Sequence, residues 1–355
     1  MAASREFLLE LTPRHRFDLF DVNAALREAH GDVLHDHRRA LYASYHTTAG
    51  YLDEASCASV GFNGEGVRGL VERYRQLYPA GAGYRHDRLD ERHELTAKQK
   101  ETEPLNADAH LSFFGAGLEG CVTYHAETDR PAWFVDLDGV GVTGPRTRRT
   151  AVVGFDEERV AARLSLTAPS SDHRIDAFNL RDARLGVIDE IQAHVQRLGI
   201  AKGRVDIRLR ADDPGAALAV NEYETLLMQH DLADVLRNPF RYAAEKSWHA
   251  LRHPHEVKEK AKDYAKYDLV VFVNDQLTRW NLRGTAAERV VNAVIRRTAL
   301  KYLRMKRAVS LPISDHDREG VGEIVQGTYQ SPILVQWNRP RAAERRLDVE
   351  IVSFE

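Results

Sequence analysis

Cysteine is almost absent from this sequence of 355 residues, which contains only Cys57 and Cys121. Two cysteines cannot form the disulfide framework of a small secreted domain, and these two lack the CxxC spacing of a structural zinc site. The fold therefore depends on a buried core, which a hydrophobic content of 43% can supply. This cysteine usage fits a reducing compartment.

Long hydrophobic runs and a large excess of one charge are also missing. Apolar stretches such as residues 267–273 are far too short to span a bilayer, and the N-terminal residues have no charged-then-apolar signal pattern. The formal net charge of -3 argues against nucleic-acid binding that is mainly electrostatic. We therefore expect a cytoplasmic protein that binds neither a membrane nor nucleic acid. Walker, Rossmann and Gly-x-Ser-x-Gly loops are absent as well.

The sequence does contain an internal repeat. Residues 9–22 and 164–180 both read Leu-x-Leu-Thr, a short loop, then His-Arg, an apolar residue and Asp. Alternating apolar residues before each loop predict a strand, and a helical pattern follows each segment. Gly199 is the predicted stop of the second helix.

The repeat continues in the same order along both halves. The matching pairs are a strand with a turn at 40–55 and 204–227, a helix ending in proline at 69–79 and 230–239, and an arginine-rich segment with an alternating strand at 144–155 and 339–354. Four matches in one order predict a duplication, with one domain at 1–155 and a divergent second domain at 156–355. The second domain carries an insertion near 240–310. Its helical pattern at 286–305 has apolar residues at i+4 spacing, which we interpret as packing.

Three histidine-centred motifs lie in the first copy. They are HTTA with His46, YRHD with His86 beside Asp87, and NADAHL with His110. Three neutral imidazoles with an open water position form an ordinary catalytic zinc site. Since the motifs are far apart in sequence, folding has to bring them together. The alternative is that each is a surface or hydrogen-bonded histidine.

Two other polar features have competing interpretations. His249 and His253 have the i, i+4 spacing of shared ligands, but Pro254 and the surrounding charge favour a solvated helix end. The arginine-rich turn at 144–149 can bind phosphate through charge-assisted hydrogen bonds, or it can be a charged edge strand that resists aggregation.

The motifs of the first copy resemble those of the YjbQ family, whose members are described as secondary thiamine-phosphate synthases. The resemblance covers about residues 5–155 and is carried by HTTAG at 46–50, YRHD at 84–87, NADAHL at 106–111 and a closing DG with GPRTRR at 138–149. It implies an α+β fold, with a two-sheet β-sandwich and flanking helices, that assembles as a homotrimer with sites near subunit contacts. Three chains of two fused domains would then form a pseudo-hexamer.

The second copy resembles the same family through other pieces. GAALAVNE at 215–222, LPIS at 311–314 and QGTYQSPI at 326–333 match family segments, the last of them its Gly-Thr-Trp-Gln strand. Asp213 falls where the motif histidine belongs, and no counterpart of YRHD or NADAHL is found. The resemblance therefore implies that the second copy has lost the histidine site.

The first copy lacks the Gly-Thr-Trp-Gln strand of the family, which the second copy keeps in a similar form. It has residues 130–134 in place of Gly-Thr-Trp-Gln, and Asp53-Glu54 matches the family's Asn-Glu only with a gap. Each copy keeps what the other lacks. This suggests a composite site, with histidines from the first copy and Gln330 with Tyr329 from the second.

The resemblance implies a transferase that joins a pyrimidine diphosphate to a thiazole phosphate. His46, His86 and His110 would bind a divalent metal such as zinc, or one of them would act as acid or base. Thr47 and Asp87 would orient them. The expected contacts to the phosphorylated substrate are Thr47, Arg146, Arg148 and Tyr329, with Gln330 in a catalytic role. Two other functions stay open: a non-catalytic oligomeric protein that binds a metal or a small anion, and an interaction protein whose second copy docks a partner.

Overall fold

The computed structural model describes residues 3–126, 130–141, 144–237, 242, 245–246, 303–338 and 344–355. Most of the predicted insertion near 240–310, including residues 286–302 of its helical pattern, lies outside the described residues, as do His249 and His253. The chain forms two compact units. Unit 1 comprises residues 1–69, 117–223 and 306–355, and unit 2 comprises residues 70–116 and 224–305.

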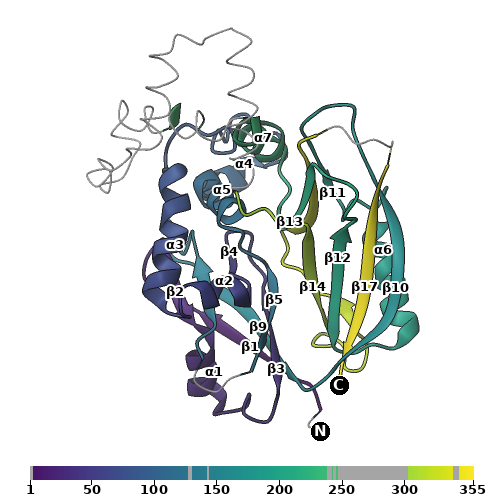
Figure 1. Ribbon diagram of the computed structural model, residues 1–355. Coiled ribbons are helices and arrows are strands. Elements are labelled where there is room, and N and C mark those ends of the chain that lie inside the picture. The colour runs from purple at the N-terminus through teal and green to yellow at the C-terminus, as the bar shows by residue number, and fades with distance from the viewer. Residues whose placement is uncertain are drawn as a thin grey trace. The chain divides into compact units, whose positions relative to one another are not determined.

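Residues 5–155 contribute two main antiparallel sheets to unit 1 (Figure 1). The larger sheet contains β1 Arg5–Leu11, β9 Arg148–Phe155, β3 Arg39–Ser44 and β5 Cys121–His125, in that order, and the smaller contains β2 Asp18–Asp21, β6 Trp133–Asp136 and β4 Ala49–Tyr51. A ribbon of β7 Val140–Gly141 and β8 Gly144–Pro145 precedes β9. Phe7, Leu9 and Leu11 alternate inward along β1, as the period of two predicted.

Residues 158–354 contribute two further antiparallel sheets to unit 1. The larger contains β10 Glu158–Pro169, β17 Glu344–Phe354, β12 Gly203–Leu209, β14 Ala308–Ser314 and β15 Glu323–Ile324, and the smaller contains β11 Asp176–Asn179, β16 Gln330–Gln336 and β13 Ala216–Glu222. Each of these sheets takes its described strands from one half of the chain. The fold class is therefore α+β, with several antiparallel sheets.

The two halves use the same strand order. Counted along the chain, the order β1-β9-β3-β5 corresponds to β10-β17-β12-β14, and the order β2-β6-β4 corresponds to β11-β16-β13. The registers also agree, since Ala49 lies opposite Asp136 in the first half and Ala216 lies opposite Gln336 in the second. The sequence repeat is thus matched by a repeat of topology.

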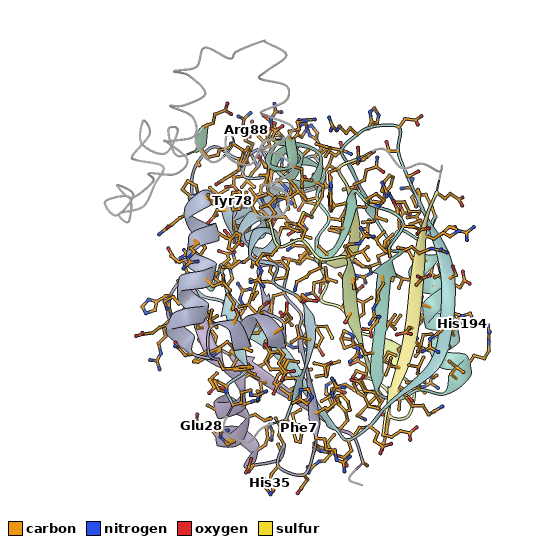
Figure 2. The ribbon with its side chains drawn as sticks, viewed as in Figure 1. Phe7, Glu28, His35, Tyr78, Arg88 and His194 are labelled. Carbon is orange, nitrogen blue, oxygen red and sulfur yellow. The ribbon has the colours of Figure 1, made fainter. Side chains whose placement is uncertain are left out.

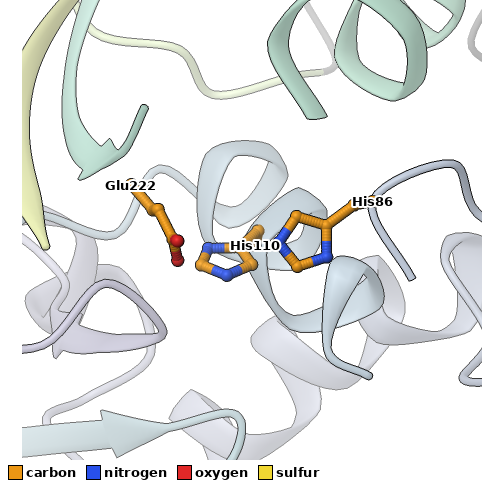
Figure 3. A group of neighbouring side chains, drawn as sticks. All are labelled: His86, His110 and Glu222. Atoms are coloured by element: carbon orange, nitrogen blue, oxygen red, sulfur yellow. The ribbon is translucent and has the colours of Figure 1, made fainter. Parts of the chain in front are cut away.

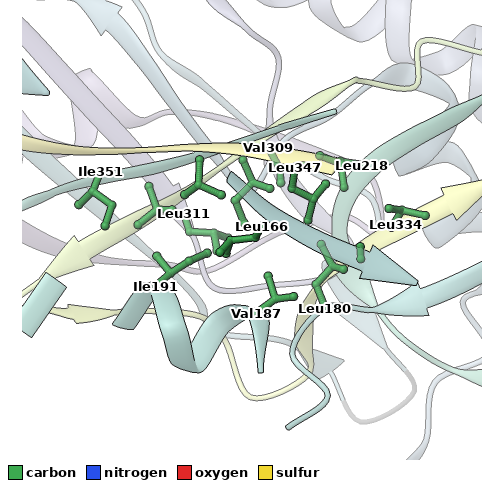
Figure 4. Close-up of a cluster of buried hydrophobic side chains, with 14 of the residues drawn as sticks. Leu166, Leu180, Val187, Ile191, Leu218, Val309, Leu311, Leu334, Leu347 and Ile351 are labelled. Carbon is green, nitrogen blue, oxygen red and sulfur yellow. The ribbon is translucent and has the colours of Figure 1, made fainter. Parts of the chain in front are cut away.

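A hydrophobic core fills the second half between its two sheets and α6 Val187–Leu198 (Figure 4). The side chains drawn there include Leu166 of β10, Leu311 of β14 and Leu334 of β16, together with Ile191 of α6. The helix faces this core with Val187, Ile191 and Val195, which follow the i, i+4 spacing of one helical face. Gly199 ends α6 with a left-handed φ of 63°, so the predicted helix stop is confirmed.

A second, smaller core joins the two halves inside unit 1. Val352 and Phe354 of β17 pack with Leu41, Ala43 and other buried residues of the first large sheet. The rings of Phe155 and Phe354 are stacked, with centroids 3.8 Å apart and planes 1° from parallel. The last strand of the chain therefore completes the packing of the first half.

Short polar caps fix the helices of the first half. Asp21 accepts hydrogen bonds from the first-turn N–H groups of Asn23 and Ala24 in α1 Val22–His30, and Asp53 accepts from Ser56 in α2 Glu54–Ser59. The ring of Phe7, labelled in Figure 2, lies 5.4 Å from the ring of His30 on α1. These contacts attach α1 to the sheet.

Unit 2 is helical in its described part. It contains most of α3 Gly64–Leu77, then α4 Ala97–Thr102, α5 Ala107–Ala116, and a π-helical turn at Leu227–Asp231 that runs into α7 Leu232–Arg237. All ten residues of α5 are buried, which makes it the central helix of this unit. Gly115 allows α5 to approach α3 closely, because a Cβ there would lie 3.0 Å from Tyr74 and 3.2 Å from Tyr78 (labelled in Figure 2).

Three further features of the structure bear on the expectations from the sequence. The charged-edge interpretation of the arginine-rich turn is wrong for Arg148 and Arg149, because β9 carries them between β1 and β3 in the interior of the sheet, whereas Gly144–Pro145 form one strand of the two-stranded β7-β8 ribbon. Cys57 and Cys121 are both buried and free, in agreement with the absence of a disulfide framework. Among the helices described, none has both the length and the apolar character needed to cross a membrane.

Candidate histidine sites

His110 lies in the middle of the buried helix α5 of unit 2. The NADAHL motif forms the start of this helix, with the N–H groups of Ala109 and His110 donating to the carbonyl of Asn106. The carboxylate of Asp87 accepts a hydrogen bond from the N–H of Ala107 at 3.0 Å. A residue of the YRHD motif thus satisfies a first-turn donor of the helix that carries His110.

His86 is held by a buried carboxylate that the motif analysis did not single out. The backbone N–H groups of Arg85 and His86 donate to Asp231 at 3.1 and 2.9 Å, and the hydroxyl of Tyr242 donates to the same side chain. Burial raises the pKa of Asp231, although the backbone donors oppose this effect. No sequence signal marked Asp231, because it lies about 145 residues from the loop that it holds.

The two imidazoles of unit 2 lie side by side (Figure 3). The ring centroids of His86 and His110 are 5.1 Å apart with planes at 55°, and each ring offers a nitrogen within 4.8 Å of the other. Neither side chain has measurable exposure. Glu222, also drawn in Figure 3, ends β13 and belongs to unit 1. The structure therefore brings together two of the three predicted histidines in one unit.

Asp87 orients the first of these rings. Its Oδ1 lies 3.1 Å from Nδ1 of His86. A carboxylate is an acceptor, so a neutral His86 places its proton on Nδ1 and leaves Nε2 with a lone pair. This carboxylate–histidine arrangement is the one that prepares an imidazole to bind a metal. The predicted orienting role of Asp87 is thus consistent with its geometry.

His46 lies in unit 1 and has a different environment. Its Nε2 accepts the backbone N–H of Arg149 at 2.7 Å, which places the proton of the neutral ring on Nδ1. Burial, together with the positive charges of Arg148, Arg149 and Arg146, lowers the pKa of His46 to about 3. The ring is therefore neutral near pH 7.

Gln330, the predicted catalytic glutamine, is buried beside the His46 loop. Its Nε2 donates to the carbonyls of Ser44 and His46 at 3.0 and 2.9 Å, and its Oε1 accepts the N–H of Gly327 at 2.8 Å. Tyr329, by contrast, is 67% exposed. The predicted contact between the two copies at this place is present within unit 1, but the amide of Gln330 faces backbone groups.

The two arginines predicted to contact phosphate differ in their availability. Arg148 is buried and forms a two-point ion pair with Asp136 at 2.7 and 2.9 Å, and it also donates to the carbonyl of Asp138. Arg146 is partly exposed and pairs with Asp138 at 2.9 Å. Of the two, Arg146 is the better placed to meet a ligand. Thr47 uses its carbonyl to accept from Asn221 at 2.7 Å.

The second half has an ion pair where the sequence alignment placed a histidine. Asp213 pairs with the buried Arg345, which also donates to the carbonyl of Asn338 and approaches Gln336. A neutral histidine at position 213 could not form the ion pair that the Asp213 carboxylate forms with the guanidinium of Arg345. Asp213 therefore forms an ion pair at this position of the second half.

A cavity of about 470 Å³ opens in the second half of unit 1. It is lined by Phe178, Asn179, Asp182, Arg184 and Tyr223, together with Ala177 and Leu185. None of the predicted site residues lines it. Asp182 and Arg184 pair with each other at its rim, at 2.5 Å.

Comparisons with known proteins give a single kind of match. No family model and no curated protein matches the sequence. Solved structures do match: a YbjQ-like protein of unknown function from Sulfolobus solfataricus P2 has 18% identity and a TM-score of 0.30, covering 56% of this chain and 99% of its own. A hypothetical protein from Aeropyrum pernix K1 has 15% identity and a TM-score of 0.29, covering 54% and 98%.

A third match is an uncharacterized conserved protein of the yjbq/upf0047 family from Clostridium acetobutylicum, with 13% identity and a TM-score of 0.26, covering 54% of this chain and 99% of its own. Over about half of its length, the chain is therefore similar to solved YjbQ-like proteins, the family that its motifs resemble.

Proposed function

We propose that this chain binds a divalent metal ion through His86 and His110, and that the metal serves a YjbQ-like enzyme acting on a small phosphorylated substrate. The observation that carries the proposal is the buried pair of imidazoles in unit 2, one of which is oriented by Asp87. Neighbouring buried histidines with a carboxylate behind one ring are typical of metal sites, and the nitrogens of these two rings lie within 4.8 Å of each other.

The residues of unit 2 fit two ligand positions of a zinc site. His86 would use Nε2, because Asp87 accepts the proton on Nδ1. His110 would be supplied by α5, whose start Asp87 also holds. A bound divalent ion would supply Lewis acidity for the charge on a leaving pyrophosphate. Asp87 would keep His86 in one tautomer, and Asp231 would hold the backbone of the loop.

The specific reaction that we propose is the transfer implied by the family resemblance, in which a pyrimidine diphosphate joins a thiazole phosphate. Arg146 would contact a phosphate group, since its guanidinium is partly exposed and shares Asp138 with Arg16. Arg148 would act indirectly, through the ion pair that holds Asp136. These roles rest on the resemblance and on the charges around β9.

Metal analysis tests the proposal. We expect about one transition metal per chain after purification without chelator, and loss of that metal in a His86→Ala/His110→Ala variant. His93→Ala is the matched control, because His93 is an exposed histidine of the same loop region. Metal content equal in the double variant and the wild type would refute the site. Turnover of pyrimidine diphosphate with thiazole phosphate tests the reaction separately.

A second candidate function is a non-catalytic protein that binds a metal or a small anion. The complete burial of His86 and His110 favours it, because a catalytic ion has to be reached by substrate. Stoichiometric metal, or a thermal shift with phosphate or pyrophosphate, in the absence of turnover would select this function.

We also propose that the chain is a tandem duplication that assembles as a homotrimer. The shared strand order and register of the two halves support the duplication. The trimer rests on the family resemblance. Light scattering coupled to size exclusion tests it, with a mass of about three chains of 40.2 kDa expected.

A further inference from the structure

The loop that carries His46 is attached to the second half of the chain by side-chain amides. Gln330 donates to the carbonyls of Ser44 and His46, and Asn221 donates to the carbonyl of Thr47. Both amides are buried. Three backbone acceptors within four residues of the loop therefore depend on donors that come from β16 and β13, more than 170 residues away.

Close backbone packing accompanies these hydrogen bonds. Gly327, which donates to Oε1 of Gln330, lies directly against the carbonyl of Tyr45, so that a side chain at this position would collide with the loop. Gly120 lies against the Gln330 amide on another side, where a Cβ would be 3.4 Å from Nε2. The amide is thus held in one orientation, with its oxygen toward Gly327 and its nitrogen toward the loop.

The loop in turn fixes the ring of His46. The N–H of Arg149 donates to Nε2, and the N–H of Tyr45 donates to the carbonyl of Arg149 at 3.4 Å. The imidazole therefore depends on β9 for its tautomer and on the second half for the backbone from which it projects. Loss of the amide donors would leave buried carbonyls unsatisfied and allow the loop to move.

We propose that Gln330 and Asn221 are positioning residues that hold His46 as a neutral Nδ1–H donor to a small anion. This assigns Gln330 a role through His46 in place of direct catalysis. The ring would donate from Nδ1 to an anionic acceptor such as a phosphate oxygen, since its Nε2 already accepts from Arg149. The choice of a phosphate acceptor rests on the proposed function, whereas the positioning role rests on the hydrogen bonds alone.

The second half contains a matched control for this role. Gln336 is also completely buried, and its Nε2 also donates to two loop carbonyls, those of Ser171 and His173. Gln330→Met and Gln336→Met remove the same groups from similar environments. Both variants should lose comparable stability, and only the first should disturb His46.

Two measurements on the full chain separate positioning from general destabilisation. Hydrogen exchange of the Arg149 amide reports the bond to His46, and nitrogen-15 chemical shifts report the tautomer of the His46 ring. In Gln330→Met we expect Arg149 exchange about tenfold faster, as loss of one buried hydrogen bond implies, and a mixed-tautomer signal for His46. Gln336→Met should leave both unchanged. Asn221→Ala, which removes one donor, should give a smaller effect of the same kind.

The outcomes distinguish this inference from the proposed function. If Gln330→Met and Asn221→Ala leave the Arg149 exchange rate and the His46 tautomer at wild-type values, or if Gln336→Met changes them equally, the positioning role is refuted. If the chain holds no metal but these readouts change as expected, the metal proposal fails and the positioning role stands. If His46→Ala leaves the affinity for inorganic pyrophosphate unchanged, the phosphate acceptor is refuted.

Discussion

Asp87 accepts hydrogen bonds from both Nδ1 of His86 and the backbone N–H of Ala107, which begins the helix of His110. A single carboxylate therefore sets the tautomer of one imidazole and the position of the helix that carries the other. This relationship makes Asp87 the most informative residue for testing the histidine pair.

Asp87→Asn should weaken metal binding without abolishing folding. Both contacts are made by Oδ1, so an amide oxygen at this place can still accept from Ala107 and from Nδ1 of His86, but the negative charge behind the imidazole is lost. Loss of such a carboxylate behind a liganding histidine typically costs about 10–100-fold in metal affinity. Competition with a chromogenic chelator would measure the change. An unchanged affinity would contradict the orienting role.

The Asp136–Arg148 pair should contribute strongly to stability, because both side chains are buried and the contact has two points. Asp136→Asn leaves a buried guanidinium without its counter-charge, and we expect a loss of about 3–5 kcal/mol in the free energy of unfolding. The control is Arg163→Ala, because Arg163 forms its ion pair with Glu350 at the exposed surface. That variant should lose about 0–1 kcal/mol. Urea denaturation would compare the two.

Glu119 should make stability depend on pH. Burial, opposed by Lys306 and reinforced by Asp53, raises the pKa of Glu119 from 4.5 to about 7. The folded chain then binds more protons than the unfolded chain between pH 4.5 and 7. The free energy of unfolding therefore falls as the pH rises through this window, by about 3 kcal/mol from this group.

Glu119→Gln removes this dependence. Urea denaturation of the wild type and the variant between pH 5 and 8 would measure the difference of their slopes, which cancels the contribution of other carboxyl groups. Parallel curves would show that Glu119 ionises normally. The raised pKa of Lys306 and the lowered pKa of Asp53 act outside this window, above pH 10 and below pH 4 respectively.

Two glycines should respond to alanine in opposite ways. Gly199 has a left-handed φ of 63°, so Gly199→Ala should destabilise by about 1–2 kcal/mol. Gly69 lies on the exposed face of α3 with open space around it, so Gly69→Ala should stabilise by about 0.5–1 kcal/mol. Thermal denaturation of both variants would check the signs, and equal shifts would contradict the argument.

Local features of the fold were accessible from the sequence. The alternation of Phe7, Leu9 and Leu11, the spacing of Ile191 and Val195, and the stop at Gly199 each reflect a period or a backbone preference of a few residues. The order of motifs also anticipated the repeated strand order. Such signals survive because they act between near neighbours in the chain.

Most polar contacts at the candidate sites could not be predicted from the sequence. Asp231 supports His86, and Gln330 supports the His46 loop, through pairs separated by 145 and 284 residues. The residues that flank Asp231 and Gln330 in the sequence do not predict which distant residue each one contacts. The alignment did place Gln330 near the histidine loop, but it could not show that the amide would face carbonyl groups, which depends on how β16 meets that loop.

The stacking of Phe155 on Phe354 has a consequence for synthesis of the protein. The first half can pair its strands once residue 155 has left the ribosome, but the outer face of its sheet waits for the last strand. At about 5–20 residues per second, the remaining chain takes on the order of 10–40 s to emerge. During that interval we expect an apolar surface around Leu41 and Phe155 to stay uncovered, which makes the nascent chain prone to association until β17 is made.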